Sequence, residues 1–303
     1  MTTPLPASLL IVNLPSISIV TPSFNQAAFL ESAIRSVLDQ EYPHLEYVVM
    51  DGRSSDGSVA ILERYGPRFT SWTSEPDGGQ YDAVTRGFGR TRGEIMGWLN
   101  SDDAYLPGAL AVVGEIFAHF PQIEWLTTLF PINWDTRDRA VHQEALRGFS
   151  AAALFSGEHL PSRWGFSLGH LQQESTFWRR SLWERAGAGI DPAFPLAGDF
   201  ALWAQFARHT EPVGVAAPLG GFRLQDMQKT ARRFAEYQAE AQRALVKYGG
   251  RPSAAWQRPW REIATRCPVA AHRALWRARL LYRAQIVRWR IPGGGWALEE
   301  RYV

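Results

Sequence analysis

Cysteine is almost absent from this chain. Its 303 residues include one cysteine, Cys267, so no internal disulfide can form and a hydrophobic core must hold the fold together. This is compatible with a reducing cytoplasm, although a secreted protein without disulfides would have the same composition. Long apolar runs are missing as well: the start, MTTPLPASLLIVN, has no basic residue before its short apolar stretch, and no later stretch reaches the roughly 18 apolar residues of a membrane span. We therefore expect a cytoplasmic protein without a signal peptide or a transmembrane helix.

Several phosphate-binding and metal-binding motifs are also missing. The chain contains no G-x-x-x-x-G-K-[ST] loop, no G-x-G-x-x-G after its first apolar segment, no H-E-x-x-H and no Cys/His spacing typical of zinc. Any phosphate group must therefore be bound without a glycine-rich cradle. A nucleotidyltransferase normally carries a glycine-rich first loop with Lys or Arg, and PSFNQ has neither feature.

Charge is distributed unevenly although the net charge is only +2. Residues 230–303 hold 15 Lys/Arg against 5 Asp/Glu, a net charge of +10, which leaves −8 for residues 1–229. The sequence thus predicts an acidic body with a basic tail.

Apolar segments alternate between strand-like and helical patterns over the first 130 residues. We expect strands over 16–20, 45–51, 69–74, 94–100 and 123–130, and helices over 26–40, 57–66, 80–90 and 107–120. Such alternation predicts an α/β fold with a doubly wound, mostly parallel sheet. Residues 137–170 lack a clear period and are interpreted as a loop region that shapes an acceptor site, and 229–249 is predicted to be a long helix.

Acidic residues follow three of the first four predicted strands. They occur in DGRSSD, EPDGG and NSDD, whereas TPSFN follows the first strand. Asp and Gly often simply end strands, but ligands of open α/β sheets bind at this edge. Clustered carboxylates raise each other's pKa unless a cation neutralises them, and Mn²⁺ or Mg²⁺ binds carboxylates together with substrate phosphates. The pattern favours a site for a divalent cation and a nucleoside diphosphate.

Four ordered motifs resemble the family 2 glycosyltransferases of the GT-A fold. They are SIVTPSFNQAAFLESAIRSVLDQ, YVVMDGRSSDGS, SEPDGGQYDAVTRGF and GEIMGWLNSDD, with a weaker continuation through QQESTFWRRSLWERAG, AGDFALW and GFRLQDMQKT. The resemblance implies a GT-A catalytic domain over 16–230, with a nucleotide-sugar half (16–130) and an acceptor half (131–230). An N-terminal segment (1–15) would precede it, and a basic helical extension (231–303) would follow it.

The resemblance also assigns roles to individual residues. Asp103 would bind the metal ion, Asp102 would face the ribose or sugar, and Asp199 would be the catalytic base, although Asp199 could instead cap a helix. The remaining nucleotide-sugar contacts would come from Pro22, Ser23, Phe24, Asn25, Asp51, Asp77, Gln80 and Asp82. Relatives often carry a histidine at the position of Gln225, so Gln225 or its neighbour Asp226 would have to replace it in the metal shell.

The implied reaction is metal-dependent transfer of a sugar of the hexosyl type from a nucleoside-diphosphate sugar to a hydroxyl group, with inversion. The acceptor would be a glycan, a glycolipid or another hydroxyl compound in the synthesis of a bacterial-type cell-surface polysaccharide. Two alternatives stay open: a non-catalytic protein that binds nucleotide sugars or carbohydrates, and a nucleotidyltransferase.

The tail segment 268–290 holds six arginines and two tryptophans. Its pattern predicts a basic amphipathic helix, which would either bind an anionic membrane or pack on the catalytic domain. The first alternative would place the protein at the inner face of the membrane. Nucleic acid is not expected as a partner, because it would leave the acidic cluster unexplained.

Overall fold

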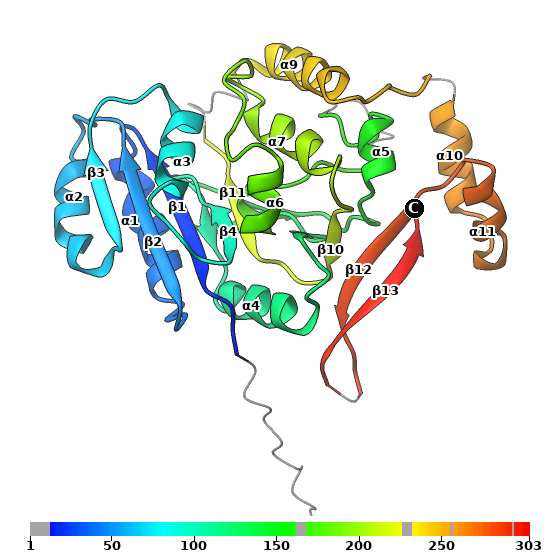
Figure 1. Ribbon diagram of the computed structural model, residues 1–303, viewed down its shortest axis with the longest axis horizontal. Helices are drawn as coiled ribbons and strands as arrows, with labels where there is room; N and C mark the ends of the chain where they lie inside the picture. The colour runs from blue at the N-terminus through cyan, green and yellow to red at the C-terminus, as the bar shows by residue number, and fades with distance from the viewer. Residues whose placement is uncertain (1–12, 162–167, 226–231, 255–256, 293) are drawn as a thin grey trace, which may run out of the picture.

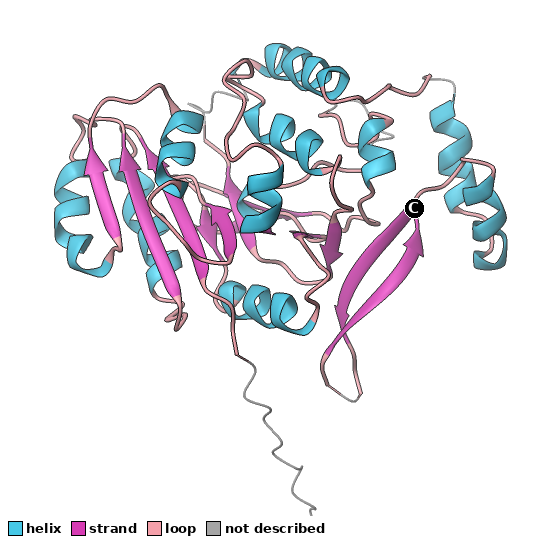
Figure 2. Cartoon of the chain, viewed as in Figure 1, coloured by secondary structure: helices cyan, strands magenta, loops and turns pink. Residues whose placement is uncertain are grey.

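A nine-stranded sheet forms the centre of the molecule in the computed structural model, which describes residues 13–161, 168–225, 232–254, 257–292 and 294–303 (Figure 1). Figure 2 shows helices packed on the two sides of this sheet. In their order across it, the strands are β13 (Trp296–Tyr302), β12 (Arg283–Trp289), β10 (Val213–Val215), β6 (Trp125–Thr128), β9 (Thr176–Arg179), β4 (Ile95–Trp98), β1 (Ile17–Ser23), β2 (Leu45–Asp51) and β3 (Ser71–Ser74).

The sheet is mostly parallel. Strands β3, β2, β1 and β4 run in the same direction, and β10 is parallel to both β6 and β12. Only β9 and β13 run antiparallel to their neighbours, β9 being inserted between β4 and β6. The predicted doubly wound α/β fold is therefore confirmed.

Alternate residues of the strands face two separate hydrophobic cores. Ile17 and Ile19 of β1 point to one face, and Val20 points to the other, as the period of two in a strand requires. The first core is covered by α1 (Ala27–Leu38), α2 (Ser58–Tyr65) and α4 (Ala109–His119), and the second by α3 (Gln80–Phe88), α6 (Arg180–Arg185), α7 (Gly198–Phe206) and α9 (Phe234–Lys247).

Tryptophans fill much of the second core. Trp98 at the end of β4 stacks on Trp203 of α7 with 6.0 Å between ring centroids, and Trp125 of β6 stacks on Trp203 at 5.7 Å. Such aromatic pairs contribute about 0.5–1.5 kcal/mol each beyond the burial of their area. The stack fixes α7 against the strand that leads to the paired aspartates, and both Trp98 and Leu99 are buried.

A second, four-stranded sheet lies beside the first. Its order is β5 (Ala104–Tyr105), β11 (Gly220–Arg223), β7 (Ile132–Trp134) and β8 (Ala140–Gln143). The antiparallel pairing of β5 with β11 brings the turn after β4 next to Arg223. The region 137–170, which the sequence left without regular structure, thus contains β8 and the short helix α5 (Ala151–Phe155).

The prediction of one amphipathic helix over 268–290 is wrong. Helix α11 (Val269–Arg277) ends before Arg279, which has a left-handed φ of 60°, and the chain continues as β12. Strand β12 is held between β10 and β13, and Ile286 and Val287 face the two different cores. Strand β12 therefore has buried apolar residues on both of its faces, whereas an amphipathic helix would bury one face and expose the other.

The residues beyond 230 are divided between helices and this hairpin. Helix α9 packs on α7, and α10 (Gln257–Thr265) and α11 lie at the far end of the molecule beyond β12 and β13 (Figure 1). The domain boundary at 230 stays a prediction. In the described part of the chain, no helix combines the length and the apolar character needed to cross a bilayer.

Candidate active site

A cavity of about 780 Å³ lies at the carboxyl ends of β1, β2, β3 and β4. This is the edge where ligands bind in open α/β sheets. Its opposite wall comes from later elements, including the first turn of α7 and helix α9. Among its lining residues are Pro22, Ser23, Phe24, Gln26, Gly52, Asp77, Gln80, Tyr81, Trp98, Asn100, Ser101, Asp102, His170, Gln173, Glu174, Leu196, Asp199, Phe222, Gln225, Phe234 and Tyr237.

Seven of the predicted site residues line this cavity. They come from four segments of the chain, which the parallel sheet and α7 bring together: Pro22, Ser23, Phe24, Asp77, Gln80, Asp102 and Asp199. The ring of Phe24 is 62% exposed, so it offers an open apolar surface at the mouth of the cavity. A planar base can stack on such a ring.

Three predicted contacts, Asp51, Asn25 and Asp82, are not among the residues that line the cavity. Asp51 is buried, and its carboxylate accepts hydrogen bonds from the backbone and hydroxyl of Ser54 and from the hydroxyl of Ser74. Asn25 bonds to the 54–55 turn, and Asp82 accepts the backbone N–H of Gly78 at 2.9 Å. Asp51 is buried and Asn25 and Asp82 are exposed, and all three brace turns beside the cavity.

The two adjacent aspartates point in different directions. Asp102 lines the cavity, and its carboxylate accepts a hydrogen bond from the side-chain amide of Gln225. Asp103 is fully buried and accepts the backbone N–H of Arg223 at 2.8 Å and the side-chain amide of Asn100 at 3.1 Å. Because β5 begins at Ala104 and pairs with β11, the carboxylate of Asp103 is fixed between these elements. The structure therefore does not bring Asp103, the predicted metal ligand, into the cavity.

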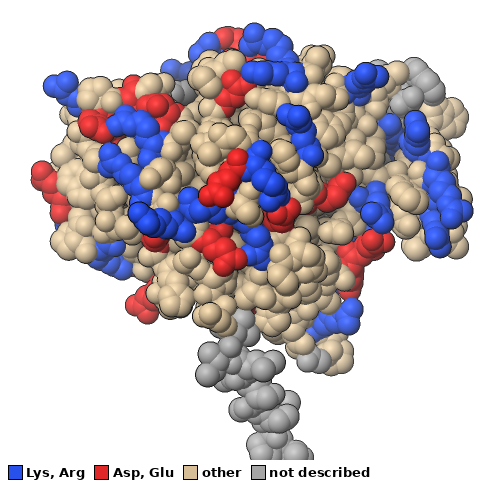
Figure 3. Space-filling model, viewed as in Figure 1, with Lys and Arg blue, Asp and Glu red and all other residues tan. Residues whose placement is uncertain are grey.

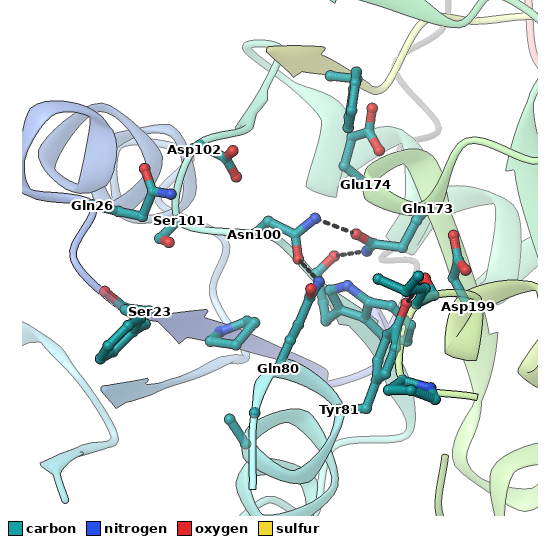
Figure 4. A pocket seen from close by; sticks show the side chains of 18 of the residues that line it. Ser23, Gln26, Gln80, Tyr81, Asn100, Ser101, Asp102, Gln173, Glu174 and Asp199 are labelled. Carbon is teal, nitrogen blue, oxygen red and sulfur yellow. Dashed lines mark hydrogen bonds between the residues drawn. The ribbon is translucent and has the colours of Figure 1, made fainter. Parts of the chain in front are cut away.

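Negative charge accumulates around this cavity. Burial raises the pKa of Asp102, and burial together with the charges of Asp102 and Glu174 raises the pKa of Asp103 well above its usual range. Burial also raises the pKa of Glu174 to about 8. Figure 4 shows the carboxyl groups of Asp102, Glu174 and Asp199 around the same space. Among the described residues that line the cavity there is no Lys or Arg.

A divalent cation fits this donor set in part. Within the described ranges, no three His, Cys, Asp or Glu side chains are grouped as ligands of a metal ion. Mg²⁺ and Mn²⁺ need only one or two carboxylates when substrate phosphates and water complete the shell, and Asp102 supplies one that faces the cavity. Burial raises the pKa of Asp102 and Glu174, and a nearby cation would lower these pKa values by stabilising the ionised carboxylates. Gln225 contacts Asp102, whereas Asp226 lies outside the described residues.

Asp199 occupies the first turn of α7 and is partly exposed to the cavity. It does not cap the helix, since the N-cap residue is Ala197. Burial raises the pKa of Asp199 to about 6, while hydrogen bonds from the backbone of Phe200 and the hydroxyl of Tyr237 act in the opposite direction. A carboxylate with a pKa near 6 is ionised at neutral pH yet basic enough to accept a proton in a reaction.

A chain of amides connects the two walls of the cavity. The side-chain amide of Gln80 donates to the side-chain oxygen of Asn100 at 2.7 Å, and the side-chain amide of Asn100 donates to the side-chain oxygen of Gln173 at 2.9 Å (Figure 4). Gln173 in turn donates to the backbone carbonyl of Trp98. Asn100, Gln173 and Tyr237 were not among the site residues predicted from the sequence. The position of Asn100 directly after a strand was the one available signal.

The structure defines an α/β protein with a ligand cavity at the carboxyl edge of its sheet, and comparison with known proteins specifies the family. A model described as glycosyl transferase family 2 matches residues 18–177. An uncharacterized glycosyltransferase of Mycobacterium tuberculosis is 30% identical over 214 residues, which cover 69% of this chain and 75% of that protein. The chain belongs to glycosyltransferase family 2.

Two other relatives match shorter segments. A putative teichuronic acid biosynthesis glycosyltransferase of Bacillus subtilis is 34% identical over 94 residues, which cover 30% of this chain and 37% of the relative. A β-1,3-glucosyltransferase of Campylobacter jejuni, named for GalNAc(5)-diNAcBac-PP-undecaprenol, is 30% identical over 118 residues, which cover 35% and 37%. The names of both relatives thus describe glycosyl transfer, one of them in teichuronic acid biosynthesis.

Solved structures establish the GT-A fold. Staphylococcus aureus TarS, residues 1–349 in complex with UDP-GlcNAc, superposes with a TM-score of 0.59 at 13% identity and covers 84% of this chain and 77% of that one. The mannosyltransferase PcManGT of Pyrobaculum calidifontis, in complex with GDP-Man and Mn²⁺, has a TM-score of 0.57 at 19% identity, with 79% and 66% covered. At these identities the likeness concerns the fold alone.

Proposed function

We propose that this glycosyltransferase moves a sugar from a nucleoside-diphosphate sugar to a hydroxyl group, with inversion at the anomeric carbon. The observation that carries the proposal is the position of Asp199. Its carboxylate lines the same cavity as Asp102 and the turn Pro22–Phe24, but it comes from the opposite wall. A base and a nucleotide site on opposite sides of one cavity suit a single displacement, in which the acceptor attacks the face opposite the leaving group.

The proposed step needs one base and no enzyme nucleophile. Asp199 accepts the proton of the acceptor hydroxyl while that oxygen forms its bond to the anomeric carbon. The bond from this carbon to the diphosphate oxygen breaks, and the diphosphate leaves with the electron pair. Phe24 and Ser23 would contact the nucleoside, and Asp77 and Gln80 would contact the ribose and sugar.

Asp102 would hold the divalent cation, in place of the originally predicted Asp103. The support is geometric: of the two carboxylates, the one of Asp102 lines the cavity, whereas that of Asp103 is bound to a backbone N–H and an amide. Mn²⁺ or Mg²⁺ supplies positive charge that stabilises a departing diphosphate. The side-chain oxygen of Gln225 lies close enough to Asp102 to contribute to the same shell after rotation of its amide.

Thermal shift with a panel of nucleotide sugars tests the donor and the metal together. A ligand that binds the native state raises the melting temperature. We expect at least one UDP-, GDP- or dTDP-sugar to do so in the presence of Mn²⁺, and to release the nucleoside diphosphate, not pyrophosphate, when an acceptor is present. If no nucleotide sugar stabilises the protein with or without Mn²⁺, the proposed donor class is wrong.

We further propose that the acceptor is a lipid-linked glycan and that the C-terminal helices contact the inner face of an anionic membrane. Figure 3 shows Lys and Arg side chains gathered at the end of the molecule where α10 and α11 lie. Exposed apolar side chains occur in the same helices, namely Trp260, Ile263 and Val269. Apolar side chains beside basic ones favour binding to anionic lipid surfaces.

Flotation with phosphatidylglycerol vesicles tests the membrane contact. Because β12 and β13 belong to the central sheet, truncating the tail would damage the fold, and point variants are preferable. Arg273→Glu with Arg277→Glu on α11 should abolish flotation. The same charge change at Arg35 and Arg64, exposed on α1 and α2 at the other end, should leave it intact. Equal flotation of both double variants would contradict the proposal.

A further inference from the structure

Helix α9 comes from the part of the chain beyond the predicted catalytic domain, yet it reaches the candidate active site. It lies against α7, the helix that carries Asp199, and its residues Ala241, Ala244 and Leu245 are buried in the same core as α7 (Figure 1). Phe234 and Tyr237 at its start line the cavity. The contact between these two helices therefore shapes the site itself.

Tyr237 is the side chain of α9 that touches Asp199. Its hydroxyl donates to the two carboxylate oxygens of Asp199 at 3.2 and 3.4 Å. Burial and the charge of Asp199 raise the pKa of Tyr237 well above its usual range. The phenol therefore stays protonated at any pH at which the enzyme would work, and it acts as a permanent hydrogen-bond donor to the carboxylate.

Glu240, three residues further along α9, binds the chain just before α7. Its carboxylate accepts the backbone N–H groups of Leu196 at 2.8 Å and Ala197 at 3.0 Å, and it is buried. Helix α7 has no side-chain cap of its own, since its N-cap residue is Ala197. Glu240 thus fixes, from another helix, the two residues that lead into α7, as the N3 carboxylate of a capping box does for the N-cap N–H.

We infer that α9 belongs to the catalytic machinery, with Tyr237 as the positioning residue that orients the carboxylate of Asp199 into the cavity and Glu240 as the residue that fixes the turn beneath it. This inference rests on the proposed function in one respect, the role of Asp199 as the base. The contacts that carry it do not depend on that role.

The inference predicts a specific effect on the ionisation of Asp199. The titratable groups around this carboxylate are Tyr81 of α3, Glu174 before β9, and Tyr237 and Glu240 of α9. The hydrogen bond from Tyr237 favours the ionised form and so lowers the pKa of Asp199, in opposition to burial. Removing the hydroxyl should therefore raise this pKa, and the base should be protonated at a higher pH than before.

Tyr237→Phe is the test, because it removes one oxygen atom and leaves the ring that packs against α7. We expect the acidic limb of the kcat profile to move to higher pH by about one unit, the size of effect expected from one lost hydrogen bond to a carboxylate. The KM for the donor should stay unchanged. Tyr248→Phe is the matched control: Tyr248, just after α9, donates to Asp191 at 2.6 Å, away from the cavity, and its loss should not move the limb.

The second pair of variants tests the contact of Glu240 with the backbone before α7. Glu240→Ala should lower kcat at every pH, because two backbone N–H groups before α7 lose their partner, and the donor KM should again stay unchanged. Glu236→Ala, one turn earlier on the exposed side of α9, should behave like the wild type. Equal kcat values for these two variants would remove Glu240 from the account.

A measurement that needs no turnover separates this inference from the proposed function. The carboxyl carbon of Asp199 can be titrated by NMR in protein with ¹³C-labelled aspartate, its signal being assigned by its loss in Asp199→Asn. A rise in its pKa in Tyr237→Phe but not in Tyr248→Phe supports the role of α9, even if Asp199→Asn still transfers sugar and the proposed base is wrong. If neither the titration nor the acidic limb moves in a Tyr237→Phe protein that melts like the wild type, the inference is overturned.

Discussion

Replacing Asp102 and Asp103 separately by alanine should give two opposite phenotypes. Asp103→Ala leaves the buried backbone N–H of Arg223 without its acceptor, and the side-chain amide of Asn100 keeps one of its two acceptors, Gln173. Each unsatisfied buried group costs about 1–3 kcal/mol, so we expect a loss of up to roughly 3 kcal/mol in the free energy of unfolding. At about 2–4 °C per kcal/mol for a protein of this size, the melting temperature should fall by up to roughly 12 °C.

Asp102→Ala removes a carboxylate that faces the cavity and repels Asp103 and Glu174. Its melting temperature should therefore equal or exceed that of the wild type. The stabilisation by Mn²⁺ with nucleoside diphosphate should disappear, whereas Asp103→Ala should retain it. For the wild type this stabilisation is about 2.7 kcal/mol when the ligand concentration is 100 times the Kd.

Differential scanning calorimetry with and without Mn²⁺ and UDP or GDP measures both effects in one experiment. The reasoning is refuted if Asp103→Ala melts like the wild type but no longer responds to the ligand, while Asp102→Ala keeps the full response. That result would restore the original assignment of Asp103 as the metal ligand.

Three further predictions follow from the same cavity. Asp199→Asn should lower kcat by a factor of about 10²–10⁴ and leave the donor KM unchanged. The wild-type kcat should fall as the pH drops below about 6, because Asp199 then binds a proton. A wild-type kcat that stays constant down to pH 5 would contradict this role of Asp199. Gly198→Ala would place a Cβ 2.6 Å from the ring of Tyr81, so steady-state kinetics should show a lower kcat, because the first turn of α7 must shift. Glu174→Gln should raise the melting temperature at pH 9 and have little effect at pH 5. The pKa of Glu174 is about 8 in the folded protein, against 4.5 in the unfolded chain. Ionising the buried carboxyl group at high pH therefore lowers the free energy of unfolding of the wild type, and this loss disappears as the pH falls from about 8 to 4.5.

The strand and helix pattern of the first 130 residues could be predicted because it is local. Each strand there is a short apolar run and each helix has an apolar stripe, and β2 begins and ends at the predicted residues, 45 and 51. The parallel order of the predicted strands was enough to predict that the acidic residues gather at the carboxyl edge of the sheet. The family resemblance then pointed to Asp199, which is 96 residues beyond Asp103 in the chain and in the opposite wall of the cavity.

The features that the sequence missed or left open depend on distant parts of the chain. Strand β12 exists because β10 and β13 supply its hydrogen bonds, and its arginines gave the segment a helical appearance. Which of two adjacent aspartates faces the cavity is decided by the pairing of β5 with β11, whose partners Tyr105 and Gly220 are 115 residues apart. Tyr237 approaches Asp199 only because α9 packs on α7.

The anomeric configuration of the product tests the central claim most directly. Once the panel has identified a donor, ¹H NMR of the reaction with Mn²⁺ and a hydroxyl acceptor should show the anomer opposite to that of the donor, with release of one nucleoside diphosphate. The Asp199→Asn variant should form almost none of it while still binding the donor. A product with the donor's own configuration, or pyrophosphate as the leaving group, would contradict the account.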